Sequence, residues 1–289
     1  HLMIYAGESN MKRVWLEAGG KSANIVFADA PCLKTAAEAA AAAICFNQGE
    51  MCTAGSRLLI ERSVKDEFMA LLLEAMKGWK AGHALDPATT VGALVDTGHL
   101  NSVLSYIEAG HAENAKLLCG GKRTLEETGG VYVEPTIFDN VTNSMRIAAE
   151  EIFGPVLSVI TFDTTEEAIQ IANDSIYGLA AAIWTSNLSK AHLAAKALRV
   201  GSMWVNQYDG GDMTPVAKIM GPEGVGARGE LDFRRGPVLL FDVGGGSTEF
   251  VLCDGVDARH IQSLPLGHIR AAETHPLGAT ADEDDWSEF

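Results

Sequence analysis

The sequence predicts an α/β fold with a largely parallel sheet over residues 1–208. The main observation is that short β-branched or apolar runs alternate with helix-like segments, which is typical of sheets joined by crossover helices. A second is composition: 47% of the residues are hydrophobic and 21% are charged, as in globular proteins. A third is length, because 289 residues correspond to about two domains.

The elements follow in order from local patterns. Residues 33–46 are rich in alanine, which favours a helix that packs closely. Ser63 is a candidate cap for the next helix, and the Thr-Thr-Glu-Glu run from Thr164 resembles a capping box. Strands are expected at residues 14–17, 24–27, 57–61, 116–119, 131–138, 156–162, 180–184 and 202–206, and helices at 33–46, 63–79, 99–109, 164–172 and 188–198.

The composition changes near Tyr208. Residues 209–236 contain many Gly and Pro without a sustained period, which indicates a junction or linker. Residues 237–275 include the hairpin-like run PVLLFDVGGGSTEFVLCDG and a further extended segment. Residues 276–289 form an acidic tail that we expect to be disordered.

Charge and cysteine content exclude several classes of function. With 22 Lys and Arg against 38 Asp and Glu, the net charge of −16 offers no basic face for nucleic acid or an anionic membrane. No apolar run approaches the roughly 20 residues that span a bilayer. The five cysteines form no CxxC pair and the histidines no metal-binding pattern, so we expect a reducing, cytoplasmic location and no metal.

Three polar residues stand where chemistry is possible. Cys52 follows an apolar helix beside a glycine, where backbone N–H groups favour a thiolate and an oxyanion, although most such cysteines are small core residues. Glu17 lies at an expected strand end and is followed by Gly19 and Gly20, yet the local residues alone favour a solvated carboxylate. Glu150 and Glu151 stand beside an apolar Phe-Gly-Pro turn, where a carboxylate either binds a sugar hydroxyl or simply faces water.

The segments WLEAGGKSANIVF, FNQGEMCTAGSR and EEIFGPVLSV, in this order, resemble the aldehyde dehydrogenase superfamily. YGLAAAIWT and GSMWVNQYDGGDMT resemble its later strands, so the match runs from about residue 10 to Thr214. The amino-acid sequences of these segments are most similar to those of bacterial γ-glutamyl-γ-aminobutyraldehyde dehydrogenases. The resemblance implies oxidation of a small aldehyde, of amino-aldehyde type, with NAD or NADP as the cofactor.

The same resemblance implies a role for each matching residue. Cys52 corresponds to the nucleophile that forms a thiohemiacetal and, after hydride transfer, a thioester. Glu17 corresponds to the general base that activates water to hydrolyse the thioester. Glu151 corresponds to the carboxylate that binds the nicotinamide ribose, and Phe153 to the ring near the nicotinamide.

The chain departs from this family pattern in length. Such enzymes are usually about twice as long, and the amino-terminal half that carries most of the dinucleotide-binding sheet and a second oxyanion donor is not in this sequence. The loss of one oxyanion donor typically costs ~10²–10³ in rate. We therefore expect weak or no activity, or a non-catalytic truncated or fused chain, and the loss of the usual pairing strand leaves a homo-oligomer possible but unspecified.

After Thr214 the pattern changes again. VLLFDVGGGSTEFVL and the later SLPLGHIRAAE resemble the exopolyphosphatase/guanosine-pentaphosphate phosphatase family, part of the actin-like superfamily, over about residues 236–273. The resemblance implies a short β-rich fragment in which Gly244, Gly245, Gly246 and Ser247 surround a phosphate. The other phosphate-binding hairpin and the second lobe are not in this sequence, so a phosphatase fragment is an alternative with an incomplete site.

Overall fold

The computed structural model describes residues 2–10, 17–209, 238–243, 248–254 and 257–264. The chain divides into two compact units, His1–Gly210 and Gly211–Phe289, which we describe separately. The helices of the first unit are α1 (Leu2–Glu8), α2 (Leu33–Cys45), α3 (Lys65–Met76), α4 (Thr97–Ala112), α5 (Arg146–Ala149), α6 (Thr165–Asn173) and α7 (Leu188–Ala197), with 3-10 turns η1 (Phe46–Gly49), η2 (Arg62–Val64) and η3 (Glu126–Thr128).

A seven-stranded sheet forms the centre of the first unit. Its strands are β1 (Ala23–Val26), β2 (Arg57–Glu61), β3 (Lys116–Cys119), β6 (Thr136–Asp139), β7 (Val156–Phe162), β8 (Ala180–Trp184) and β9 (Ser202–Val205). They lie in the order β3-β6-β7-β2-β1-β8-β9, and all neighbours are parallel except β3 and β6. The separate strands β4 (Arg123–Thr124) and β5 (Tyr132–Val133) pair antiparallel. The predicted α/β class with a mostly parallel sheet is therefore confirmed.

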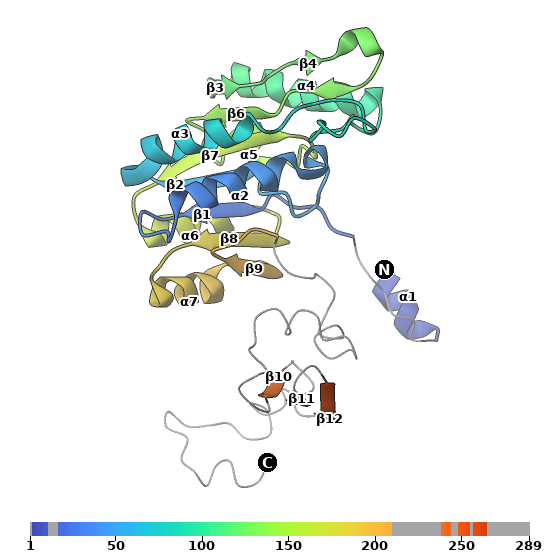
Figure 1. Cartoon of the computed structure of the whole chain (residues 1–289), viewed down its shortest axis with the longest axis vertical. Helices are drawn as coiled ribbons and strands as arrows, with labels where there is room; N and C mark the ends of the chain where they lie inside the picture. The colour runs from blue at the N-terminus through green and yellow to red at the C-terminus, as the bar shows by residue number, and fades with distance from the viewer. Residues whose placement is uncertain (1, 11–16, 210–237, 244–247, 255–256, 265–289) are drawn as a thin grey trace. The chain divides into compact units, whose positions relative to one another are not determined.

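Helices cover both faces of this sheet. Figure 1 shows α2 and α3 lying side by side over one face, where Ala40 and Leu72 pack against buried strand residues such as Leu58. On the other face, α4 to α7 bury residues such as Val103 and Ala168 against the alternate side chains of the same strands. The central strands are buried on both faces, as expected for a parallel sheet, and this explains their nearly continuous apolar sequences.

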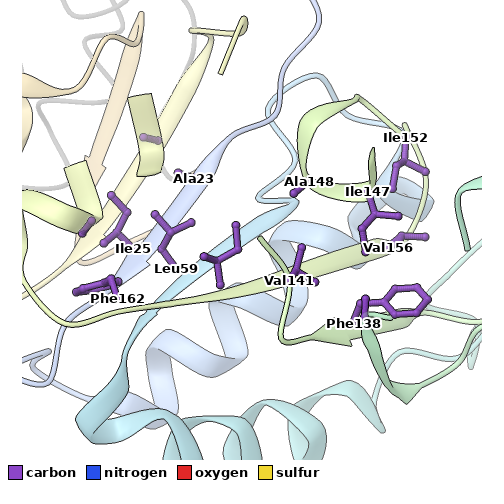
Figure 2. Packing of buried hydrophobic residues seen from close by; sticks show 14 of the residues in the cluster. Ala23, Ile25, Leu59, Phe138, Val141, Ile147, Ala148, Ile152, Val156 and Phe162 are labelled. Carbon is purple, nitrogen blue, oxygen red and sulfur yellow. The ribbon is translucent and has the colours of Figure 1, made fainter. Parts of the chain in front are cut away.

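Figure 2 shows part of the hydrophobic core between the sheet and helices α4 to α7. The ring of Phe138 lies close to the side chains of Ile147 and Val156, and all three residues are fully buried. An added Cβ at Gly110 of α4 would lie 3.0 Å from the Phe138 ring and 3.2 Å from Ile147, so the absence of a side chain allows α4 to approach. Dense packing of this kind fixes the sheet on which the candidate site stands.

Two local expectations were wrong, and a third is largely untested. The expected strand at 131–138 is two strands, β5 and β6, which pair in different sheets. Pro135 lies between them and has no N–H group to donate to a neighbouring strand. Ser63 does not cap α3: it lies in the turn η2, and its hydroxyl donates to Glu61 Oε1 at 3.0 Å. The expected strand at 14–17 falls largely outside the described residues, and Glu17 itself belongs to no strand.

The second unit contains one antiparallel sheet, β10 (Val238–Val243), β11 (Thr248–Asp254) and β12 (Asp257–Leu264), in that order. The β10–β11 pairing agrees with the hairpin that the sequence predicts. The candidate phosphate-binding residues Gly244, Gly245, Gly246 and Ser247, together with the linker after Asp209 and the acidic tail, lie outside the described residues. Within the described ranges, no helix is long and apolar enough to cross a membrane.

Candidate active site

Three segments meet at the amino-terminal edge of the sheet (Figure 1). Residues 17–22 lead into β1, residues 50–56 into β2, and residues 150–155 into β7. Because β7, β2 and β1 are adjacent and parallel, the segments that precede them lie next to one another. Ligands of open parallel sheets usually bind at the carboxyl ends, so the site is on the opposite edge from the one that rule favours.

A left-handed turn connects the end of α2 to the segment that contains Cys52. Asn47, Gln48 and Gly49 have φ angles of 48°, 54° and 74° in succession. A left-handed conformation costs an ordinary residue about 1–2 kcal/mol, so this turn needs support from its surroundings. Gln48 Oε1 accepts a hydrogen bond from Gly92 N at 3.1 Å, and Asn47 Nδ2 donates to the Glu50 carbonyl at 2.9 Å. Sequence reasoning did not identify these two residues, since nothing in a single Asn-Gln pair signals a left-handed turn.

Cys52 is half-buried and lies in the turn closed by a hydrogen bond from Ala54 N to the Met51 carbonyl at 3.1 Å. A Cβ added at Gly20 would lie 2.1 Å from the Cys52 carbonyl oxygen, well inside van der Waals contact. Only glycine allows the segment after Glu17 to pass the thiol turn at this distance. Among the described residues, nothing accepts a hydrogen bond from the Cys52 N–H group.

Glu151 links the third segment to the first. Its Oε1 accepts a hydrogen bond from Gly20 N at 2.9 Å, and its own N–H donates to Tyr177 Oη at 3.3 Å. Its Oε2 lies 2.4 Å from the position that a Cβ on Gly19 would take. The carboxylate that the sequence assigns to the cofactor therefore contacts the backbone between Glu17 and Cys52.

The four predicted residues are thus brought to one edge, with different exposures. The Glu17 side chain is exposed, and in the described parts of the chain no hydrogen bond joins it to Cys52. Phe153 is 41% exposed at a φ of 55°. Its carbonyl accepts a hydrogen bond from His99 Nε2 at 2.6 Å, and the His99 and Phe153 rings meet edge to face at 6.2 Å. His99 lies in α4 and was not identified from the sequence.

Glu50 strengthens this corner of the site. Its Oε1 lies 3.5 Å from His99 Nε2 and accepts a hydrogen bond from Val95 N at 3.1 Å, while Gln48 Nε2 donates to its Oε2 at 3.2 Å. The side chains of Glu50 and His99 are 11% and 19% exposed, respectively. The left-handed turn and the Phe153 turn are therefore held by the same hydrogen-bonded group.

An apolar cavity opens beside the thiol turn. It has a volume of about 240 Å³ and is lined in part by Met51 and Thr53, the residues on either side of Cys52. Phe46, alanines of α2, Tyr208 and Asp209 also line it. Tyr208 is fixed by a hydrogen bond from its hydroxyl to the Thr53 carbonyl at 2.7 Å, and burial raises the pKa of that hydroxyl. The cavity has the dimensions and lining of a pocket for a small organic molecule.

Two cations lie beneath the site. Lys21 and Arg57 are each 2% exposed. Arg57 donates to the carbonyls of Lys21, Ile171 and Ala172 and to Asn143 Oδ1, at 2.9–3.2 Å. Burial, followed by the charge of Arg57, lowers the pKa of Lys21 to about 7.

The residues present fit part of a nicotinamide nucleotide. The Glu151 carboxylate can accept hydrogen bonds from ribose hydroxyls, and the exposed ring of Phe153 offers an apolar face beside it. Within the ranges that the structure describes, no cluster of three or more His, Cys, Asp or Glu could hold a metal ion. The arrangement of a thiol, a free backbone N–H, nearby carboxylates and an apolar pocket is suited to covalent chemistry at a carbonyl carbon.

The fold is that of the aldehyde dehydrogenases, and the chain belongs to the aldehyde dehydrogenase family, whose model matches residues 1–224. A curated relative, the NADP/NAD-dependent aldehyde dehydrogenase PuuC of Escherichia coli strain K12, is 54% identical over 213 residues, which are 74% of this chain and 42% of PuuC.

Solved structures agree with this assignment. Aldehyde dehydrogenase KauB from Pseudomonas aeruginosa is 78% identical with a TM-score of 0.70, over 74% of this chain and 43% of KauB. A γ-glutamyl-γ-aminobutyraldehyde dehydrogenase from Burkholderia cenocepacia J2315 is 57% identical with a TM-score of 0.69, over 73% of this chain and 43% of that chain. The chain therefore spans less than half the length of these relatives.

Proposed function

We propose that this chain carries the nucleophile and the carboxylates of an NAD(P)-dependent aldehyde dehydrogenase, which oxidises an amino-aldehyde to a carboxylic acid. The observation that carries the proposal is the contact of Gly20 with the Cys52 carbonyl. This contact brings the segment after Glu17 against the turn that contains Cys52. A reaction that uses both the Glu17 and the Cys52 side chains requires such proximity.

In this proposal, Cys52 Sγ adds as a thiolate to the carbonyl carbon of the aldehyde. The Cys52 N–H group donates to the oxyanion that forms. The bound nicotinamide supplies a hydride acceptor, and the hydride leaves the carbon that is bonded to Sγ. Glu17 then takes a proton from the water that attacks the thioester, which releases the carboxylic acid and restores the thiol.

The 240 Å³ cavity supports a small substrate with a polar end. Phe46 and Met51 provide apolar walls beside the turn that contains Cys52, and Asp209 places a carboxylate in the same lining. A carboxylate at that position favours a cationic amine at the far end of the aldehyde. The Burkholderia relative is a γ-glutamyl-γ-aminobutyraldehyde dehydrogenase, which supports the same substrate class. PuuC is an NADP/NAD-dependent aldehyde dehydrogenase, which supports both NAD and NADP as cofactors.

We propose that turnover by these 289 residues alone is slow or absent. The share of PuuC that the chain spans, 42%, supports this expectation. The edge strand β9 supports assembly with another chain, such as a second copy, because its outer side has no strand partner among the described residues. Light scattering at several concentrations measures that assembly.

Two measurements test the proposal. The first is the rate of alkylation by iodoacetamide, resolved by peptide, in the wild type and in Cys52→Ser, with Cys32→Ser as the matched control. We expect Cys52 to be alkylated and γ-aminobutyraldehyde to protect it, while Cys32→Ser leaves that protection unchanged. The second is NAD(P)H formation from the same aldehyde, which Cys52→Ser should abolish.

Each result distinguishes among the alternatives. Protection of Cys52 with slow NAD(P)H formation supports an aldehyde dehydrogenase of low turnover. Orthophosphate release from polyphosphate supports the exopolyphosphatase alternative, for which the antiparallel pairing of β10 and β11 around residues 244–247 is the supporting observation. Neither protection nor product, with a non-cooperative urea transition, supports a non-catalytic chain.

A further inference from the structure

The burial of the Lys21 side chain is unfavourable for folding. Its side chain is 2% exposed, and Nζ has no hydrogen-bond partner among the residues that the structure describes. A buried polar group without a partner costs stability, and a buried charge costs more. An apolar side chain of similar length, such as Met, would avoid this cost.

The surroundings of Lys21 connect it to the candidate active site. A small cavity of about 10 Å³, which accommodates about one water molecule, is lined in part by Lys21, Arg57 and Tyr177. The Tyr177 hydroxyl accepts the hydrogen bond from Glu151 N, and Gly20, the residue before Lys21, donates to Glu151 Oε1. Both hydrogen bonds of Glu151 therefore end on residues beside the ammonium or its cavity.

The charges around Lys21 are few. Arg57 of β2 opposes its protonation, and Glu151 and Glu150, from the segment before β7, favour it. Glu150 is already engaged by the Tyr106 hydroxyl at 2.8 Å and by Arg146 Nε at 3.0 Å. Arg57 donates to three backbone carbonyls and to Asn143. Of the two carboxylates, Glu151 is the one whose side chain is hydrogen-bonded to the neighbour of Lys21, the Gly20 N–H group.

We propose that Lys21 is a positioning residue for Glu151: its buried ammonium, hydrated by one water in the adjoining cavity, holds the Glu151 carboxylate against Gly20 and so orients it for the nicotinamide ribose. The assignment of the ribose to Glu151 rests on the proposed function. The electrostatic coupling of Lys21 to Glu151 does not, and it is tested without any cofactor.

The test is a double-mutant cycle on the unfolding equilibrium at pH 6, with Lys21→Met, Glu151→Gln and the double variant. Both substitutions remove a charge while keeping the approximate shape, and Gln still accepts the bond from Gly20. We expect a coupling of about tenfold in the unfolding equilibrium constant between the two sites. The control cycle pairs Lys21→Met with Glu127→Gln, an exposed carboxylate, and should give a coupling within twofold of unity.

A coupling within twofold of unity for Lys21 and Glu151 overturns the proposal. Lys21→Gln serves as a second variant for the same cycle if Lys21→Met does not fold. Binding of NADH, measured by its fluorescence, is a separate readout: we expect Lys21→Met to raise the Kd about tenfold. Absence of NADH binding by the wild type would count against the proposed function, and the cycle would still decide the role of Lys21.

Discussion

At the residue scale, the site depends on a close backbone contact rather than on a long-range ion pair. Gly20 lets the chain between Glu17 and β1 pass the Cys52 carbonyl, and Gly49 similarly allows contact with the Gly154 backbone, 2.4 Å from its added Cβ position. Both contacts involve main-chain atoms, which cannot move aside as a flexible side chain can. The geometry around the thiol is therefore sensitive to single added methyl groups.

The first prediction concerns Gly20→Ala. The added Cβ overlaps the Cys52 carbonyl, so we expect a loss of about 1–3 kcal/mol in the free energy of unfolding and a changed rate of Cys52 alkylation. Urea unfolding and peptide-resolved alkylation measure the two effects. Gly78→Ala is the control, because its added Cβ meets nothing nearer than 3.5 Å; equal effects of the two variants would contradict the prediction.

The second prediction concerns the pH dependence of stability through Lys21. Its pKa is about 7 in the folded protein and 10.5 as an ordinary lysine. Between these values the unfolded chain binds one more proton than the folded chain, so wild-type stability rises with pH by up to about 1.4 kcal/mol per unit from this residue. Below pH 7 the burial cost is fully present, and above pH 10.5 it has disappeared.

Lys21→Met should remove this contribution and be more stable than the wild type near pH 6, with the difference shrinking towards pH 10. Urea unfolding at several pH values measures it. Lys116→Met, a substitution of an exposed lysine, should keep the wild-type slope. A Lys21→Met profile parallel to the wild type from pH 7 to pH 10 would show that the ammonium does not titrate in this range.

At the scale of elements, local signals predicted most of the β/α alternation. The expected bounds of β2, β3, β7 and β8 agree with the structure, because each is an apolar or β-branched run bounded by turn residues or caps. The interruption at Pro135 and the turn η2 at Ser63 were missed. Both depend on which backbone groups find partners in the sheet, and a single chain segment does not reveal this.

The third prediction tests the cap of α6. The Thr164 hydroxyl oxygen accepts a hydrogen bond from Glu167 N at 3.2 Å, as the capping-box pattern indicates. The Glu167 carboxylate accepts in return from Asp163 N, one residue before the cap. We expect Thr164→Ala to lower the free energy of unfolding by about 1 kcal/mol. Thr164→Ser keeps the hydroxyl and should lie close to the wild type, and a loss as large as that of Ala would argue against capping.

At the scale of the whole molecule, the described thiols differ in their access to solvent. Cys32 is exposed, and hydrogen bonding from Thr35 lowers its pKa. Cys45 is buried at the end of α2, and burial raises its pKa. Its Sγ donates to Met76 Sδ of α3 at 3.8 Å within the core beneath the two helices. The reactivity of Cys45 therefore reports on opening of the whole first unit.

The fourth prediction is that iodoacetamide modifies Cys32 and Cys52 much faster than Cys45 in the native protein. Exposure of Cys45 requires separation of α2 from the sheet, so its rate should rise steeply with urea and follow the global transition. Peptide-resolved mass spectrometry measures the separate rates. Modification of Cys45 at the rate of Cys32 in native buffer would show that α2 opens independently.

The candidate site could be predicted in part. The order of motifs marked Cys52, Glu17, Glu151 and Phe153 through family resemblance, and the structure brings their segments to one edge of the sheet. Gln48, Glu50 and His99 were missed, because their roles are to support turns from other parts of the chain. Such roles depend on contacts between residues that are distant in sequence, and these leave no local pattern.

The sequence by itself determined the fold class, the order of most elements and the family, because apolar periodicity and motif order are written along the chain. Only the tertiary structure decided that the site lies at the amino edge of β7, β2 and β1 and that Gly20 contacts the Cys52 backbone. It also decided that Lys21 is buried with no hydrogen-bond partner for Nζ in the part of the chain that the structure describes. The physical reason is that strand order and close packing bring together residues that are far apart in sequence, and the free energy of those contacts depends on the whole sheet.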